Sequence, residues 1–195
     1  MRIGVLAIQG DFAAHARMLA DSGVEAVEVR RAEQFKAIDG LIIPGGESTT
    51  MLKVMTEEGL LNPLRKLARD GKAVFGTCAG AILLASEVQN PEQESLGLMN
   101  IAVERNSYGR QVDSFIQQVD TSLGGGPMEA VFIRAPRITR VGAGVETLST
   151  IAGEPVLVKQ DNLLAATFHP ELTHDNRVHS LFIEMASLET ATVRV

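Results

Sequence analysis

The sequence predicts an α/β fold with an open, mostly parallel, doubly wound sheet and an antiparallel extension. Strand-like and helix-like segments alternate along the N-terminal part of the chain, an order typical of sheets with right-handed crossovers. Residues 3–8 form a continuous apolar run of strand length, as expected for a parallel strand that is covered on both faces. Residues 98–148 consist of shorter alternating pieces, which predict antiparallel strands and loops.

The remaining elements follow from the spacing of the apolar side chains and from the glycines between them. Residues 12–22 carry apolar side chains at helical spacing and are followed by Gly23, a typical C-terminal cap. Residues 24–29 alternate apolar and charged side chains, which indicates a strand nearer the sheet edge. Further predicted elements are a buried strand at 40–43, helices at 48–55 and 60–68 on either side of Gly59, a strand at 73–75 and a strand at 163–169.

Composition and charge narrow the class of protein. The 195 residues, of which 45% are hydrophobic, suffice for one substantial core, so we expect a single domain over residues 1–195. A net charge of −6 and a pI near 5.3 leave no basic stripe for phosphates, which excludes a nucleic-acid binder. No apolar run approaches the ~20 residues needed to cross a bilayer, and the run at 3–8 is too short for a signal peptide. We therefore expect a cytoplasmic protein without membrane contacts.

Cys78 is the only cysteine, and it stands between Gly76 and Gly80, after a strand-like run and before a helix-like one. A nucleophile at a tight strand-to-helix turn needs small neighbours of this kind, because they let the backbone bend and let a substrate carbonyl reach the sulfur. A helix beginning at Cys78 would also direct its N-terminal N–H groups at the thiolate. The alternative is that Cys78 is a small buried hydrophobe, as free cysteines usually are.

A second segment supplies the partners that a nucleophilic cysteine needs. His169 and Glu171 follow an apolar run, and Pro170 between them fixes the chain so that both side chains can lie on one side of it. A histidine can act as the base and a carboxylate can orient the histidine, whatever their order in the chain. Taken singly, His169 and Glu171 are equally well interpreted as surface residues. Together with Cys78 they predict a Cys-His-Glu triad.

Two other glycine-rich segments and the remaining histidines have simpler interpretations. Residues 44–49, Pro-Gly-Gly-Glu-Ser-Thr, form either an ordinary loop in which Ser48 or Thr49 caps the next helix, or an oxyanion site made of glycine N–H groups. The triple glycine at 124–126 is not followed by Gly-Lys-Ser/Thr, and it predicts a hairpin loop rather than a phosphate site. The histidines that match no catalytic motif, which we expect at the surface or in helices, are His15, His174 and His179.

The set of motifs resembles the class I glutamine amidotransferases, whose flavodoxin-like glutaminase domains hydrolyse glutamine through a Cys-His-Glu triad. Within that family, the closer resemblance is to the glutaminase subunits that serve pyridoxal 5′-phosphate synthases. The segments that carry the resemblance occur in the expected order over almost the whole chain: 4–10, 44–50, 76–80, 105–111, 132–136 and 168–171. Tyr108 is a mild departure, because phenylalanine is common at this position of the family.

The resemblance implies a role for each matching residue. Cys78 is expected as the nucleophile, His169 as general base and acid, and Glu171 as the group that orients His169. The residues expected to hold L-glutamine are Gly46, Glu47, Ser48, Arg105, Ile133 and Arg134, and those expected near the oxyanion are Gln9, Gly46 and Ala79. An arginine suits the α-carboxylate of glutamine because its planar fork donates two hydrogen bonds at once. Without the resemblance, Arg105 and Arg134 would be interpreted as solvated surface charges.

The resemblance also implies the reaction and the partner. Thiolate attack on the side-chain amide of glutamine would release ammonia and leave a thioester for water to hydrolyse, without a metal or a cofactor. In the family, the ammonia passes to a synthase subunit with a (β/α)8 barrel that builds pyridoxal 5′-phosphate. The alternatives are a glutaminase subunit of another amidotransferase, a peptidase or chaperone of the DJ-1 type on the same sheet, and a non-catalytic docking module.

Overall fold

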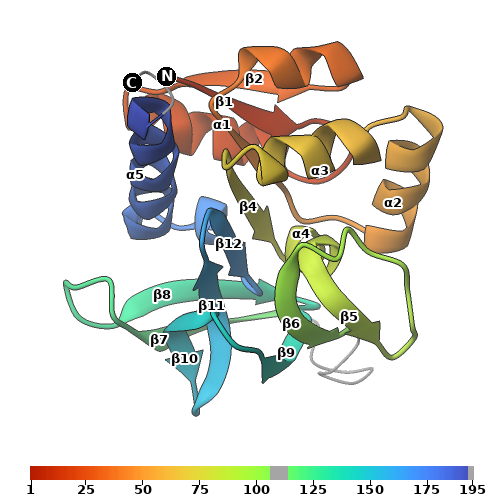
Figure 1. Ribbon diagram of the computed structural model, residues 1–195. Helices are drawn as coiled ribbons and strands as arrows, with labels where there is room; N and C mark the ends of the chain where they lie inside the picture. Colours follow the sequence, from red (N-terminus) through yellow and green to blue (C-terminus); the bar gives the residue numbers. More distant parts are fainter. Residues whose placement is uncertain (106–113, 193–195) are drawn as a thin grey trace.

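The computed structural model describes residues 1–105 and 114–192, and its centre is a nine-stranded mixed sheet (Figure 1). In spatial order the strands are β2 (Glu25–Val29), β1 (Arg2–Leu6), β3 (Gly40–Ile43), β4 (Ala73–Thr77), β12 (Leu163–Ala166), β11 (Glu154–Gln160), β10 (Glu146–Ile151), β7 (Ser114–Thr121) and β8 (Met128–Ile133). Neighbouring strands from β2 to β12 pair in parallel. Those from β12 to β8 pair antiparallel. The predicted α/β fold with an antiparallel extension is therefore confirmed.

A second, three-stranded sheet packs beside the first and contains β5 (Ala85–Gln89), β6 (Met99–Glu104) and β9 (Arg137–Val141). The pairing of β6 with β9 is antiparallel, as predicted for residues 98–148. The pairing of β6 with β5 is parallel, which the sequence did not indicate. The reason is that residues 90–98 cross back to the start of β5 instead of turning as a hairpin, so that Ala85 pairs with Met99.

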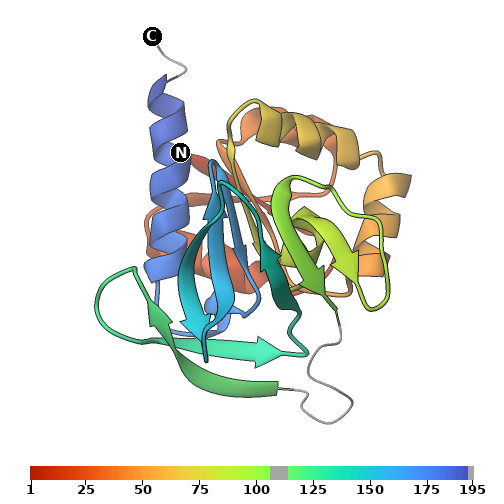
Figure 2. The ribbon, with the colours of Figure 1, turned by 60° about the horizontal axis from the view of Figure 1, so that its bottom comes forward.

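Helices cover both faces of the large sheet. One buried cluster unites the sheet with α1 (Phe12–Asp21) and α5 (Arg177–Thr192). The other cluster unites the sheet with α2 (Ser48–Glu57), α3 (Leu61–Arg69), α4 (Ala79–Leu84) and the short 3₁₀ helix η1 (Ala32–Ala37). Alternate residues of β12 enter the two clusters, Leu163 and Ala165 on one face and Leu164 and Ala166 on the other. This is the predicted doubly wound arrangement, and Figure 2 shows α5 on the opposite side of the sheet from α2 and α3.

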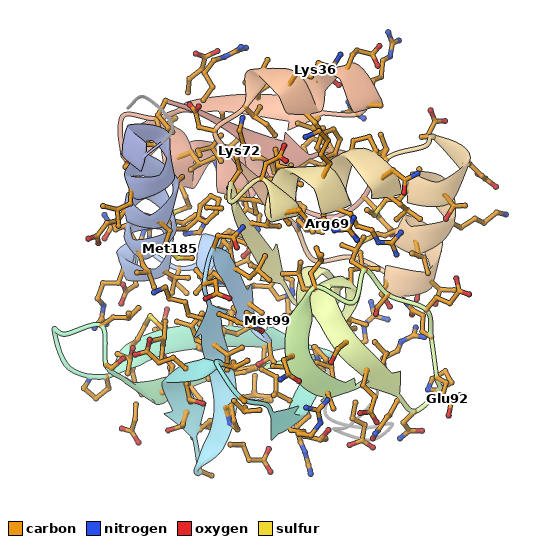
Figure 3. The ribbon with its side chains drawn as sticks, in the orientation of Figure 1. Lys36, Arg69, Lys72, Glu92, Met99 and Met185 are labelled. Carbon is orange, nitrogen blue, oxygen red and sulfur yellow. The ribbon has the colours of Figure 1, made fainter. Side chains whose placement is uncertain are left out.

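The side chains in Figure 3 separate a dry interior from a charged surface. Met99 and Met185 are buried, whereas the labelled Lys36, Arg69 and Glu92 are exposed. Within residues 1–105 and 114–192, no helix is long and apolar enough to cross a membrane.

Two local expectations for turns are also met. Gly59 lies between α2 and α3, as predicted. The glycines 124–126 connect the antiparallel pair β7 and β8 as a hairpin loop. The guanidinium group of Arg177 holds this loop by donating to the carbonyl oxygens of Gly126, at 2.8 Å, and Pro127, at 3.2 Å.

The turn from β4 into α4 depends on close contacts of Gly76 and Gly80. A methyl group on Gly80 would lie 2.1 Å from the carbonyl oxygen of Ile43 in β3. A methyl group on Gly76 would lie 2.5 Å from the carbonyl of Gly80. Both positions therefore require glycine, because any larger side chain would push α4 away from the sheet edge.

We predict that Gly80→Ala lowers the free energy of unfolding by on the order of 3 kcal/mol, because the methyl group meets rigid backbone rather than a flexible side chain. Urea denaturation of the purified protein measures this loss. Gly153→Ala is the matched control: Gly153 has φ +82° and no atom within 4 Å of an added methyl group, so only backbone strain of about 1 kcal/mol is expected. An equal or smaller loss at Gly80 would show that α4 moves freely away from β3.

Candidate active site

Cys78 lies at the carboxyl edge of the parallel strands, between the end of β4 and the start of α4. Its backbone has φ +50° and ψ −105°, an unusual conformation for a residue with a side chain and a common one at functional sites. The side chain is nearly buried, with 7% exposure. The N–H of Cys78 donates to the carbonyl oxygen of Ala166 at 2.8 Å, which ties the turn to the end of β12.

His169 and Glu171 come from the segment that follows β12. Nδ1 of His169 lies 2.7 Å from Oε1 of Glu171, and both side chains are buried. Pro170 opens the 3₁₀ turn η2 (Pro170–Leu172), which brings Glu171 back to the histidine ring, as the sequence predicted. The N–H of His169 donates to the carbonyl oxygen of Val131 in β8 at 2.8 Å. The histidine is therefore fixed by both its backbone and its ring.

The environment of His169 favours its charged form. Burial alone would lower the pKa of His169, but hydrogen bonds with Cys78 and Glu171 and the negative charges of these groups raise the pKa to about 10. Because Nδ1 is taken by Glu171, Nε2 is the ring nitrogen left for Cys78. At neutral pH the arrangement is thus an imidazolium held between a carboxylate and the sulfur.

A cavity of about 120 Å³ opens beside Cys78. All six residues predicted to hold L-glutamine line it together with the cysteine: Gly46, Glu47, Ser48, Arg105, Ile133 and Arg134. Ile82 and Pro136 also line the cavity, and the sequence analysis did not identify them. Sγ of Cys78 lies 3.8 Å from the carbonyl oxygen of Ile133, to which a thiol can donate.

The two arginines of the cavity differ in exposure. Nη2 of Arg105 lies 3.0 Å from Oε1 of Glu47 and 3.1 Å from Oγ1 of Thr49, and its side chain is only 15% exposed. The interpretation of Arg105 as a solvated surface charge is therefore wrong. Arg134 is exposed and has φ +43°. Of the segment 105–111, only Arg105 falls within the described residues, so the predicted departure at Tyr108 lies outside them.

Glu47 fixes the loop that precedes α2. Its carboxylate accepts from the N–H groups of Thr49, at 3.2 Å, and Thr50, at 2.7 Å. Burial opposes ionisation slightly, but these donors and the Thr50 hydroxyl lower the pKa of Glu47 to about 2. Glu47 is thus the N-cap of α2, and the alternative in which Ser48 or Thr49 caps the helix is wrong. The Ser48 hydroxyl donates instead to Oε1 of Gln93 at 2.8 Å.

The residues expected near the oxyanion occupy different positions. Gly46 lines the cavity, and Ala79 is the first residue of α4, where an N–H group has no acceptor within the helix. Oε1 of Gln9 accepts from the N–H of Glu47 at 3.1 Å. The structure therefore places Gln9 behind the loop as its support. A methyl group on Gly45 would lie 2.4 Å from Cε1 of His169, so the loop passes directly over the triad.

Two histidines that the sequence analysis expected at the surface or in helices are buried helix residues. His15 in α1 and His179 in α5 have no exposed surface, whereas His174 is exposed, as expected. Helical spacing contained a signal: His15 precedes the buried Leu19 by four residues, and His179 precedes the buried Phe182 by three. Within residues 1–105 and 114–192, no cluster of His, Cys, Asp and Glu could hold a metal ion.

Comparisons with known proteins agree with this geometry. The family model of the SNO glutamine amidotransferase family matches residues 5–188. The chain is 56% identical to the pyridoxal 5′-phosphate synthase subunit PdxT of Koribacter versatilis, over 95% of each chain. It is 54% identical to PdxT of Solibacter usitatus, over 93% of this chain and 97% of the relative. A crystal structure of a glutamine amidotransferase superposes with a TM-score of 0.89 at 49% identity, over 95% of this chain and 98% of the other.

We predict that Glu171→Gln lowers the pKa of His169 from about 10 to below its ordinary value of 6.5, because burial then outweighs the remaining partner. Ring ¹⁵N NMR across a pH series measures this change. Glu154→Gln, which removes a carboxylate paired with Arg137 at 3.7 Å, is the control and leaves the titration unchanged. An identical titration in Glu171→Gln and the parent protein would contradict the assigned contact.

The same shift has a consequence for stability. Since the folded state raises the pKa of His169 above 6.5, its stabilising contribution is fully present below pH 6.5 and is lost as the pH rises through about 10. The difference in unfolding free energy between the parent and Glu171→Gln therefore shrinks over this range, as urea titrations at several pH values can measure.

Proposed function

Since the chain belongs to the SNO glutamine amidotransferase family, we propose that it is the glutaminase subunit of a pyridoxal 5′-phosphate synthase. The observation that carries this proposal is the contact of Cys78 with His169 and of His169 with Glu171, beside a cavity lined by the residues expected to bind glutamine. Relatives at 54–56% identity carry the name of the synthase subunit. One glutaminase domain over residues 1–195 that acts in the cytoplasm is the matching organisation.

The proposed reaction begins with the thiolate of Cys78. The sulfur attacks the side-chain amide carbon of glutamine, and the carbonyl oxygen becomes an oxyanion. His169 transfers its proton to the amide nitrogen, the carbon–nitrogen bond breaks, and ammonia leaves a γ-glutamyl thioester. Neutral His169 then takes a proton from water, and the hydroxide attacks the thioester. Glutamate departs, and the proton returns the thiolate–imidazolium pair to its starting state. Glu171 stabilises the imidazolium in both steps.

The charges around the cavity suit the two ends of an amino acid. Arg105 and Arg134 can each donate paired hydrogen bonds to the α-carboxylate of glutamine. Glu47, held ionised by the N–H groups of α2, can accept from the α-ammonium. The ion pair between Arg105 and Glu47 keeps both charges at the cavity before substrate arrives. This arrangement supports a free amino acid as substrate over a residue within a peptide.

The proposed partner is a synthase subunit with a (β/α)8 barrel that receives the ammonia. Activity that depends on this partner follows from the oxyanion loop. The N–H of Glu47 donates to Gln9, so it is not directed at the triad. Rotation of the Gly45–Gly46 peptide costs little in a glycine pair and would supply an N–H to the oxyanion. Docking of the synthase subunit is the proposed cause of that rotation.

The alternatives have weaker support. Solved structures annotated by their depositors as amidotransferases for other products are only 16–18% identical to this chain, a likeness that concerns the fold alone. A non-catalytic docking module would have no need of a buried carboxylate hydrogen-bonded to a buried histidine beside a cysteine, an arrangement that is costly to maintain without a function. Peptidases of related fold have no use for charges placed at both ends of a free amino acid.

We predict that Cys78→Ala abolishes glutamate release while the protein keeps its fold, because the change removes only the nucleophilic sulfur. The assay is glutamine hydrolysis in the presence of the synthase subunit, with circular dichroism and a urea melt as controls for folding. Retention of half the parental rate would contradict the assignment of Cys78.

We further predict weak glutamine hydrolysis by the isolated chain and a large increase when the synthase subunit is added. Glutamate release with and without that subunit measures the increase, and glutamine labelled with ¹⁵N at its amide follows the nitrogen into pyridoxal 5′-phosphate. Full activity of the isolated chain, or an unlabelled product, would contradict the proposed transfer of ammonia.

A further inference from the structure

A fully buried pair of histidines lies behind the triad, on the side of Glu171 that faces away from His169. Nδ1 of His15 lies 2.9 Å from Nε2 of His179. Nε2 of His15 lies 3.2 Å from Oγ1 of Thr77 and 3.4 Å from Oε2 of Glu171. Thr77 directly precedes Cys78 in the chain. The two imidazoles therefore adjoin the triad at its carboxylate and at its strand, although the proposed reaction uses neither of them.

The second oxygen of Glu171 explains why a donor is needed here. Oε1 is occupied by His169 at 2.7 Å. Oε2 is buried and has no hydrogen bond of ordinary geometry among the residues that the structure describes. A carboxylate oxygen removed from water is costly without a donor. Nε2 of His15 is the nitrogen that lies close enough, at 3.4 Å, to reach Oε2 after a shift of a few tenths of an ångström.

The contacts favour one tautomer of each imidazole. If His15 carried its proton on Nδ1, the lone pair of Nε2 would face the negative Oε2 of Glu171, and the proton on Nδ1 would force His179 to carry its own proton on Nδ1. That Nδ1 of His179 is buried without a partner in the described part of the chain, so it would be an unpaired donor. With both protons on Nε2, His179 donates to His15 and His15 donates toward Glu171. The second arrangement leaves no buried N–H unpaired.

Both histidines are neutral at neutral pH. Burial lowers the pKa of His179 to about 4. Burial, followed by repulsion from His179 and His169, lowers the pKa of His15 well below its ordinary value. The titratable groups that face His15 are His179 from α5 and the Glu171–His169 pair from the segment after β12, and from β4 it meets the uncharged Thr77 and Phe75. A charged His15 would compete with His169 for Glu171, whereas a neutral donor supports the carboxylate without competing.

We propose that His15, oriented by His179, is a positioning residue of the triad, whose Nε2–H donates to Oε2 of Glu171 and holds Oε1 against Nδ1 of His169. The hydrogen-bonded series then runs from His179 through His15, Glu171 and His169 to Cys78. The importance of this series for turnover rests on the proposed glutaminase function. The tautomers, the titration of His169 and the reactivity of the thiol do not, because they can be measured without glutamine.

The test compares three variants of the full chain. His15→Leu removes the donor, and His15→Gln keeps an N–H near the position of Nε2. Leu19→Ala is the matched control, because Leu19 is equally buried one turn further along α1 and its loss perturbs packing alone. Alkylation by iodoacetamide at neutral pH reports on Cys78 specifically, since the chain has no other cysteine. Ring ¹⁵N NMR reports the tautomers and the titration of His169.

We expect His15→Leu to lower the alkylation rate and, with the synthase subunit, the kcat of glutamine hydrolysis by on the order of tenfold, as when outer partners of metal-binding histidines are removed. The KM for glutamine stays within about twofold, because the donor does not touch substrate. The pKa of His169 falls. His15→Gln restores most of the rate, and Leu19→Ala keeps the parental thiol reactivity and titration.

Three results would overturn the proposal: a folded His15→Leu variant with parental alkylation and His169 titration, Leu19→Ala with the same losses as His15→Leu, or an Nδ1–H tautomer of His15 in the parent protein. The last measurement needs no variant, so it decides the matter even if His15→Leu does not fold. Failure of the proposed function has a different signature, in which the parent protein releases no glutamate with the synthase subunit while the NMR and alkylation results stand.

Discussion

The parallel pairing of β4 with β12 is the interaction on which the site depends. Thr77 pairs with Ala166, and both strands end at the same edge of the sheet, so that the residues after them emerge side by side. The hydrogen bond from the N–H of Cys78 to Ala166 continues this pairing by one residue. A slip of one residue would move the two segments apart by about 3.3 Å and would turn every side chain of one strand to the opposite face. The register of two strands thus sets the distance between sulfur and imidazole.

Burial determines how the charges near this edge are distributed. His15, His169 and His179 are all buried, yet only His169 gains enough from negative neighbours to hold a proton at neutral pH. The difference comes from position along one series of contacts, because His169 lies between Glu171 and Cys78, whereas the other two imidazoles lie beyond the carboxylate. A single positive charge among three imidazoles is what a thiolate partner requires.

The sequence predicted the parts of the site whose chemistry and backbone geometry are local. Cys78 could be identified from its flanking glycines, and His169 and Glu171 from the proline between them, because each pattern reports on a turn of a few residues. The partnership of Arg105 with Glu47 and the parallel pairing of β5 with β6 could not, since both arise from contacts between distant segments. The burial of His15 and His179 was missed for a related reason. Their helical spacing relative to Leu19 and Phe182 was visible, but a polar residue on an apolar face needs a partner from another element, which periodicity does not reveal.

The long segment between α4 and β12 leaves the parallel sheet and returns to it at two neighbouring strands, so most of it can diverge in sequence without disturbing the sheet. Strand β8 is the exception within that segment. Its Val131 carbonyl accepts from the backbone of His169, and its Ile133 carbonyl lies against the sulfur of Cys78. Divergence in this segment is therefore limited at β8 by the shape of its backbone, and insertions or deletions there are tolerated far less than exchanges of its outward-facing side chains.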